Sequence, residues 1–153
     1  MKTFIILKGK RAIQEQREDY MRKETSNWWT QAGRDLISAK NALRSKDYYM
    51  VAFLCQQAVE KSLKALILHT KREFYPSHSL IYLGKSVGIP DTFHSFLREL
   101  TPQYTISRYP NAAGEVPSEL YDKEIVSDYL RKSEEVLQWI EKQLKLSENS
   151  LEE

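Results

Sequence analysis

The stretch from Asp47 to Thr70 constrains the fold most, because it contains neither glycine nor proline and its apolar residues recur every three or four positions. This spacing places the apolar side chains on one face of an α-helix. Asp47 is a residue type favoured at a helix N-cap. The sequence therefore predicts a long amphipathic helix over this stretch. Its inner face comprises Tyr49, Phe53, Gln56, Val59, Leu63, Leu66 and Ile67.

Two other long segments show the same period, one over about 26–44 and the other over about 117–146. Only a couple of residues separate the first of them from the helix that follows, so these two helices should pack antiparallel as a hairpin. Two short helices are predicted over 79–87 and 91–100, and no segment alternates like a strand. The predicted fold is all-α, an up-and-down bundle of three long helices plus two short helices.

The two ends of the chain differ from this bundle, which is predicted over 26–146. Residues 1–25 are highly charged and offer almost nothing to bury, so they should form an arm or a helical extension. Met21 lies just before the first core helix and is, beside Met1, a second candidate for the native start. Residues 147–153 are polar and predict a disordered tail.

Charge and cysteine content narrow the class of protein. The 153 residues include 23 basic and 21 acidic side chains, so the formal charge of +2 does not by itself indicate binding to nucleic acid or to a membrane. The N-terminal apolar run is too short for a signal peptide, and no run approaches the roughly 18 apolar residues of a membrane span. The single Cys55 suits a reducing compartment and behaves as a small buried apolar residue. We expect a cytoplasmic protein without a membrane partner.

Motifs for cofactor or metal chemistry are missing from the sequence. It has no Gly-rich phosphate loop, no nucleophile elbow and no cluster with metal-ligand spacing. Neither a cofactor nor a metal is therefore expected, and an autonomous hydrolase has no support.

The centre of the 47–70 helix carries polar residues where a plain core helix would be apolar. At 100° per residue, Gln56 lies on the apolar face and Glu60 at its border. A buried amide without a partner would cost about 1–3 kcal/mol, so Gln56 should be hydrogen-bonded to another helix or across a subunit boundary. It serves either as a structural contact that fixes helix register or as a ligand contact, and Glu60 has ion-pair spacing to Lys64.

Five sequence blocks, in this order, carry a family resemblance. They are "WWTQAGRDLISAKNAL", "YYMVAFLCQQAVEKSLKALIL", "HSLIYLGK", "SRYPN" and "YLRKSEEVLQWIEKQL", and they extend from about Trp28 to Leu144. Together they resemble the HEPN domain family. The resemblance implies a small helical bundle, usually a homodimer, often encoded beside a minimal nucleotidyltransferase with which it forms a toxin–antitoxin-like pair.

Some members of this family are ribonucleases, and those carry an Arg followed after four to six residues by a His, just before the last helix. Two such motifs meet across the dimer. In this chain Arg108 takes the place of the arginine, but no histidine follows it before the last helix. Arginine can bind phosphate but cannot shuttle protons. Arg72 and His78 satisfy the motif's spacing in "REFYPSH", although they follow the second long helix instead.

Arg108 and Tyr109 lie in the Pro-bounded segment 101–117, where a guanidinium can hold phosphate and a phenol ring can stack on a base. The alternative is a structural role, with Arg108 paired to a nearby helix and Tyr109 packed inward. His78, at the start of a short helix, could line the same cleft.

Three functions remain open. The first is a nucleotide- or RNA-binding module that acts with a separate minimal nucleotidyltransferase. The second is a metal-independent ribonuclease toxin with its site at the dimer interface, for which Arg108, Arg72 and His78 are the catalytic candidates. The third is a structural dimer with a decayed site.

Overall fold

The computed structural model describes residues 2–149, and this range forms an all-α bundle without a strand. The three long helices are α1 (Lys2–Ser45), α2 (Tyr48–Lys71) and α7 (Lys123–Asn149). The shorter helices are α3 (Leu80–Ser86), α4 (His94–Leu100), α5 (Gln103–Ile106) and α6 (Pro110–Ala113), with 3₁₀ turns at Asp91–Phe93 and Pro117–Glu119. The predicted fold class is confirmed. No helix in this range is long and apolar enough to cross a membrane.

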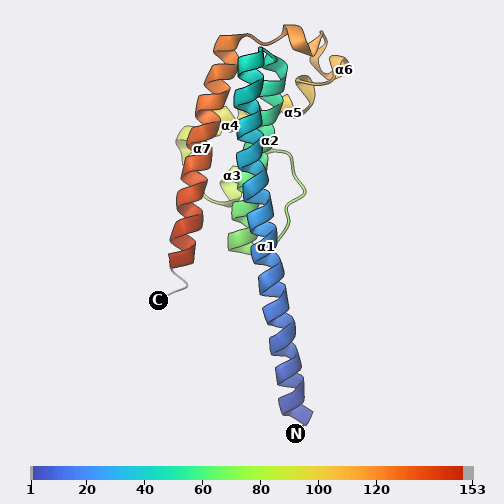
Figure 1. Cartoon of the computed structure of the whole chain (residues 1–153), viewed down its shortest axis with the longest axis vertical. Helices are drawn as coiled ribbons and strands as arrows, with labels where there is room; N and C mark the ends of the chain where they lie inside the picture. The colour runs from blue at the N-terminus through green and yellow to red at the C-terminus, as the bar shows by residue number, and fades with distance from the viewer. Residues whose placement is uncertain (1, 150–153) are drawn as a thin grey trace.

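α1 and α2 form an antiparallel hairpin, and α7 runs beside it (Figure 1). Lys46 makes the turn in the left-handed region, at φ 64°, and the Asp47 N–H donates to the Ala42 carbonyl at 2.9 Å. Asp47 occupies the predicted N-cap of α2, but its carboxylate accepts from Ser45 Oγ at 2.9 Å instead of from a helix amide. The turn is thus closed by contacts back to α1.

α2 is the central helix of the core, and most of its residues are buried between α1, α7 and the short helices. Leu63 and Ile67 of α2 and Ile140 of α7 are fully buried, and removal of such apolar surface from water is the main stabilising term in a fold of this kind. Cys55 lies in the same core beside Ser133, and burial raises the pKa of its thiol to about 12.

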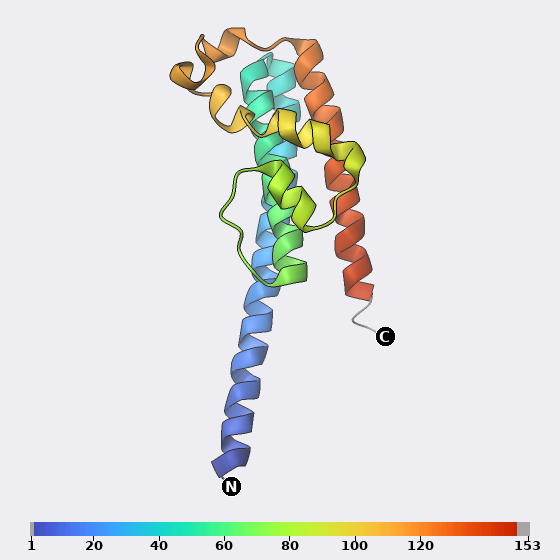
Figure 2. The ribbon, with the colours of Figure 1, turned by 180° about the vertical axis from the view of Figure 1, so that it is seen from behind.

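α3, α4 and α5 cover one side of α2 (Figure 2). A connector of residues 72–79 leaves α2 through Arg72, which is left-handed at φ 59°, and reaches α3 at Ser79. Ser79 caps α3, because its Oγ accepts from the Tyr82 N–H at 3.4 Å. Thr101 Oγ1 in turn accepts from the Leu80 N–H at 3.0 Å. These bonds hold the connector and the α4–α5 segment in fixed positions beside α2.

Several helix boundaries differ from the predicted ones. α1 begins at Lys2 instead of near residue 26, and Thr25 Oγ1 donates back to the Met21 carbonyl at 2.9 Å, so the charged segment and the first bundle helix are one continuous helix. Side chains 2–17 are all exposed and this part of α1 projects away from the bundle (Figure 1).

α7 begins at Lys123 instead of residue 117, because the Asp122 carboxylate caps it by accepting from the Ile125 N–H at 2.8 Å. At the other end of the chain, residues 147–149 of the predicted tail continue α7, while residues 150–153 lie outside the described range.

Candidate functional site

Side-chain hydrogen bonds hold the segment between α4 and α7 in a fixed conformation. Ser107 Oγ donates to the Gln103 carbonyl, and the Tyr121 hydroxyl donates to Gln103 Oε1. Gln103 and Ser107 are both buried. Burial raises the pKa of the Tyr121 phenol to about 12, so this hydroxyl stays protonated and remains a donor at neutral pH. The Pro-bounded segment 101–117, which contains the short helices α5 and α6, is therefore a fixed support for the residues that follow α5.

Three aromatic rings surround the side chain of Arg108, which lies just after α5. Its Nε donates to the Tyr104 carbonyl at 2.8 Å. Its guanidinium carbon lies 4.5 Å from the ring centroid of Phe53, 4.7 Å from that of Tyr104 and 4.9 Å from that of Tyr109. All three distances are within the range of cation–π interaction. Phe53 belongs to α2, so the guanidinium is held between the central helix and the α5–α6 segment.

The charge of Arg108 is not neutralised by a carboxylate. Across residues 2–149, no Asp or Glu forms an ion pair with it, and the Tyr109 side chain is 49% exposed instead of packed inward. Aromatic faces orient a guanidinium without cancelling its charge, so the terminal N–H groups can still bind an anion.

His78 lies against the same support. Its ring stacks on Tyr104, with centroids 4.3 Å apart and planes inclined by 13°. Its Nδ1 lies 2.8 Å from Glu60 Oε1. Because a carboxylate oxygen accepts, Nδ1 carries the proton and Nε2 of the neutral ring is an acceptor. The His78 side chain is 54% exposed, whereas that of Glu60 is 6% exposed. His78 and Arg108 therefore both contact the Tyr104 ring.

Glu60 joins this surface to the polar centre of α2. Gln56 Nε2 donates to Glu60 Oε1 at 3.2 Å, and Gln57 Nε2 donates to Gln56 Oε1 at 2.7 Å. Lys64 Nζ forms an ion pair with Glu60 Oε2 at 3.3 Å. Gln56 is fully buried as predicted, but its partners lie on α2 itself and not on another helix. Gln56, Gln57, Glu60 and Lys64 thus form one network that ends at His78.

Arg72 is not part of this cluster. It forms an ion pair with Glu18 of α1 at 2.6 Å. Along α2, Arg72 lies twelve positions beyond Glu60, which is about 18 Å of helix rise. The structure therefore does not bring Arg72 to His78, although their spacing in sequence fits the ribonuclease motif. It brings His78 and Arg108 to one ring, that of Tyr104, instead.

Sequence reasoning missed Phe53 and Tyr104, the residues on which the cluster is built. Tyr104 had a usable signal, because it precedes Arg108 by four positions and thus by one helical turn. Phe53 had none, since it was indistinguishable from the other apolar residues of its helix.

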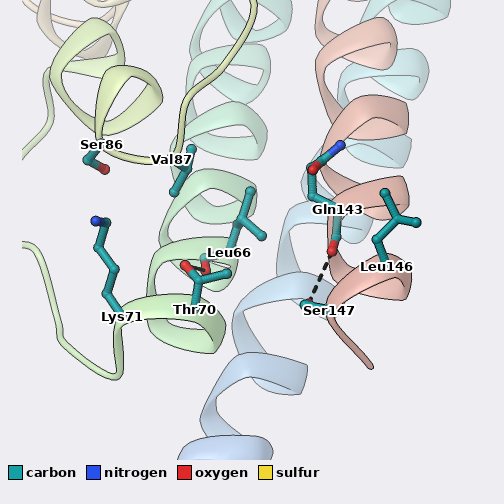
Figure 3. Close-up of a pocket in the computed structure, with 8 residues that line it drawn as sticks. All are labelled: Leu66, Thr70, Lys71, Ser86, Val87, Gln143, Leu146 and Ser147. Atoms are coloured by element: carbon teal, nitrogen blue, oxygen red, sulfur yellow. Dashed lines mark hydrogen bonds between the residues drawn. The ribbon is translucent and has the colours of Figure 1, made fainter. Parts of the chain in front are cut away.

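A separate groove lies toward the C-terminal ends of α2 and α7 (Figure 3). Leu66, Thr70 and Lys71 of α2 form its centre, and Gln143, Leu146 and Ser147 of α7 form one side. It has no aromatic ring and one charged lining residue, Lys71. No group of His, Cys, Asp or Glu within residues 2–149 could hold a metal ion.

The profile of the HEPN domain family matches residues 25–143, which is most of the chain. This chain belongs to the HEPN domain family. Two solved structures support the assignment. TT1696 from Thermus thermophilus is 27% identical with a TM-score of 0.72, and ST0689, an archaeal HEPN homologue, is 30% identical with a TM-score of 0.66. Each match covers 78% of this chain and 97% of the other. The curated proteins contain no significant match.

HEPN domains are nucleotide-binding or ribonuclease-like modules and are often dimeric. The match begins at residue 25, so the projecting part of α1 lies outside the HEPN region. The cluster of Arg108, Tyr104, His78 and Glu60 lies wholly within it.

Proposed function

We propose that this HEPN protein is a nucleotide- or RNA-binding module that holds a phosphate at Arg108, with Tyr109 and His78 beside it. The observation that carries the proposal is a guanidinium fixed by three aromatic rings and left without a carboxylate partner among residues 2–149. A fixed guanidinium can donate two parallel hydrogen bonds to a phosphate. The half-exposed Tyr109 ring supplies a face on which a base can stack.

The test is thermal unfolding in the presence of a nucleotide such as 5′-AMP. At a concentration about 100 times Kd, binding should stabilise the native state by about 2.7 kcal/mol, which for a chain of this size raises Tm by roughly 5–10 °C. Arg108→Ala should abolish most of this rise, and Arg108→Lys should keep only part of it, because lysine lacks the bidentate fork. Arg98→Ala, at an exposed arginine of α4, is the matched control. An undiminished rise in Arg108→Ala would contradict the proposal.

We further infer that the protein is a cytoplasmic homodimer that acts with a separate minimal nucleotidyltransferase in a toxin–antitoxin-like pair. Support comes from the family, and the sequence has no nucleotidyltransferase acidic motif of its own, so catalysis would belong to the partner. Co-expression with a neighbouring open reading frame that carries a Gly-Ser and paired-Asp signature should yield a stable complex. Failure of the two proteins to co-purify would remove this part of the proposal.

A second candidate function, a metal-independent ribonuclease, is favoured by the Glu60–His78–Arg108 arrangement. Glu60 orients an imidazole whose Nε2 can accept the proton of an RNA 2′-hydroxyl. The 2′-oxygen would attack phosphorus, the bond to the 5′-oxygen would break, and His78 would return the proton to that oxygen. Arg108 would stabilise the charge that develops on the phosphate. The products are a 2′,3′-cyclic phosphate and a free 5′-hydroxyl.

Incubation of single-stranded RNA with the protein in EDTA distinguishes the two functions. A ribonuclease would release cyclic-phosphate products, and His78→Ala would abolish cleavage while the RNA binding that depends on Arg108 persists. Absence of cleavage together with nucleotide binding supports the binding module. Absence of both would favour the structural dimer with a decayed site.

A further inference from the structure

A small cavity of about 190 Å³ lies at Lys64, one helical turn along α2 from Glu60. It is lined by Trp28 of α1, Lys64 of α2, and Phe74, Tyr75 and Pro76 of the connector. Its volume is below the roughly 300 Å³ at which pockets for drug-sized ligands begin. Three of its five lining residues are aromatic, so it suits one flat ring system.

Glu60 connects this cavity to the cluster around Arg108. One carboxylate oxygen of Glu60 bonds to His78 at 2.8 Å, and the other bonds to Lys64 at 3.3 Å. Lys64 Nζ in turn lies 5.6 Å from the ring centroid of Trp28. The connector supplies both a wall of the cavity, over residues 74–76, and His78 itself. Glu60 and the connector therefore link the cavity to the cluster around Arg108.

The lining residues are held in place but remain open to a ligand. Lys64 is 13% exposed and fixed by Glu60, and the Tyr75 ring stacks on Tyr82 with centroids 6.0 Å apart. Phe74, by contrast, is 51% exposed. An aromatic side chain half in water beside a fixed cation offers a stacking face and a hydrogen-bond donor at the same place. Nucleobases use both of these groups.

We propose that the Trp28–Phe74 cavity binds a nucleobase of the strand whose phosphate lies at Arg108. This inference rests on the proposed function and specifies its ligand: a single-stranded oligonucleotide of several residues instead of a mononucleotide. The strand must be single because a base enters such a pocket only when it is unstacked from its neighbours. The groove of Figure 3 lacks an aromatic ring and cannot offer this interaction.

Binding of a fluorescein-labelled, 2′-O-methylated RNA hexamer, measured by anisotropy, tests the inference. The methyl groups prevent cleavage through the 2′-hydroxyl. Phe74→Ala should weaken hexamer binding by about 5- to 150-fold, the range for loss of one stacked base, while leaving the affinity for 5′-AMP unchanged. Tyr20→Ala removes an aromatic ring of similar exposure, 55%, outside the cavity, and should change neither affinity. Arg108→Ala should weaken the binding of both the hexamer and 5′-AMP.

Tryptophan fluorescence gives a second readout that does not depend on affinity. The hexamer should quench the emission of the native protein, and Trp28→Phe should remove that quench, because Trp29 and Trp139 pack against the core. Normal hexamer affinity in Phe74→Ala, or an undiminished quench in Trp28→Phe, would overturn the cavity as a base site even if Arg108→Ala abolishes binding. Equal affinity for the hexamer and for 5′-AMP would overturn it as well. If the native protein binds neither ligand, the proposed function fails and this inference fails with it.

Discussion

At the scale of single residues, Glu60 connects the polar centre of α2 to the candidate site. Its carboxylate is nearly buried, yet it contacts Gln56, Lys64 and His78 on two elements. A buried charge is stable only when its lone pairs are satisfied. The three partners satisfy the lone pairs of Glu60. Glu60 in turn holds His78 beside Tyr104 and Lys64 beside the Trp28–Phe74 cavity.

Glu60→Ala is therefore expected to be costly. Removal of one partner leaves the Lys64 ammonium, 13% exposed, without its counterion, and we expect the free energy of unfolding to fall by about 2–4 kcal/mol. Urea denaturation measures this change. Glu15→Ala, at an exposed position of α1, should stay within about 0.5 kcal/mol of the native protein. Equal stability of the two variants would show that the network contributes little.

The lowered pKa of His69 should make the stability of the protein depend on pH. Burial lowers its pKa below the usual 6.5, with Glu148 acting in the opposite direction and Arg72 in the same direction. The unfolded chain then binds more protons than the folded one, so the contribution of His69 is fully present above pH 6.5 and is lost as pH falls below that value. Urea denaturation between pH 5 and 8 should show this loss, and His69→Gln should reduce the slope. An identical slope in the variant would refute the assignment.

At the scale of elements, the packing of α3 against α4 depends on the absence of a side chain at Gly84. A Cβ at this position would lie 2.7 Å from Leu97 Cδ1 and 2.8 Å from Ile89 Cγ2. Both neighbours are buried and cannot move far. The close approach allows α3 and α4 to cover α2 and to hold the support on which Arg108 and His78 lie.

Gly84→Ala should therefore destabilise the protein, even though alanine is the better helix former. Overpacking of a well-packed core costs about 1–3 kcal/mol, which exceeds the gain of up to about 1 kcal/mol in helix propensity. Thermal unfolding measures the balance. Gly33→Ala in α1, where no atom lies within 4 Å of the added Cβ, is the control and should be neutral or stabilising. A stabilised Gly84→Ala would show that α3 can shift outward without penalty.

At the scale of the whole molecule, α1 has two parts with different roles. From Met21 onward it packs in the bundle, whereas side chains 2–17 make no buried contact and carry the exposed residues Phe4, Ile5, Ile6 and Leu7. An isolated helix of this length is marginal in water. The projecting part therefore adds little to the stability of the fold.

Deletion of residues 2–17 should leave Tm within about 2 °C of the full-length value, because surface changes of this kind contribute within about 0.5 kcal/mol. The Glu18–Arg72 ion pair is retained in this variant. In the full-length protein, the amides of residues 2–17 should exchange with solvent much faster than those of α2. A large drop in Tm would show that the projecting helix contacts another part of the protein, such as a second copy.

The sequence alone was sufficient for the three long helices, the hairpin and the burial of Gln56, because periodic apolar positions dictate which face of a helix leaves water. The start of α1 escaped prediction, since a charged helix without a buried face gives no periodic signal. The blocks around Gln56 and Arg108 were also enough to indicate the family. Only the tertiary structure decided which polar residues meet. His78, eighteen positions after Glu60, reaches it because a connector runs back along α2, and Arg108 joins His78 because both contact one tyrosine ring. Such contacts between distant segments depend on the path of the backbone in space, which local spacing does not encode.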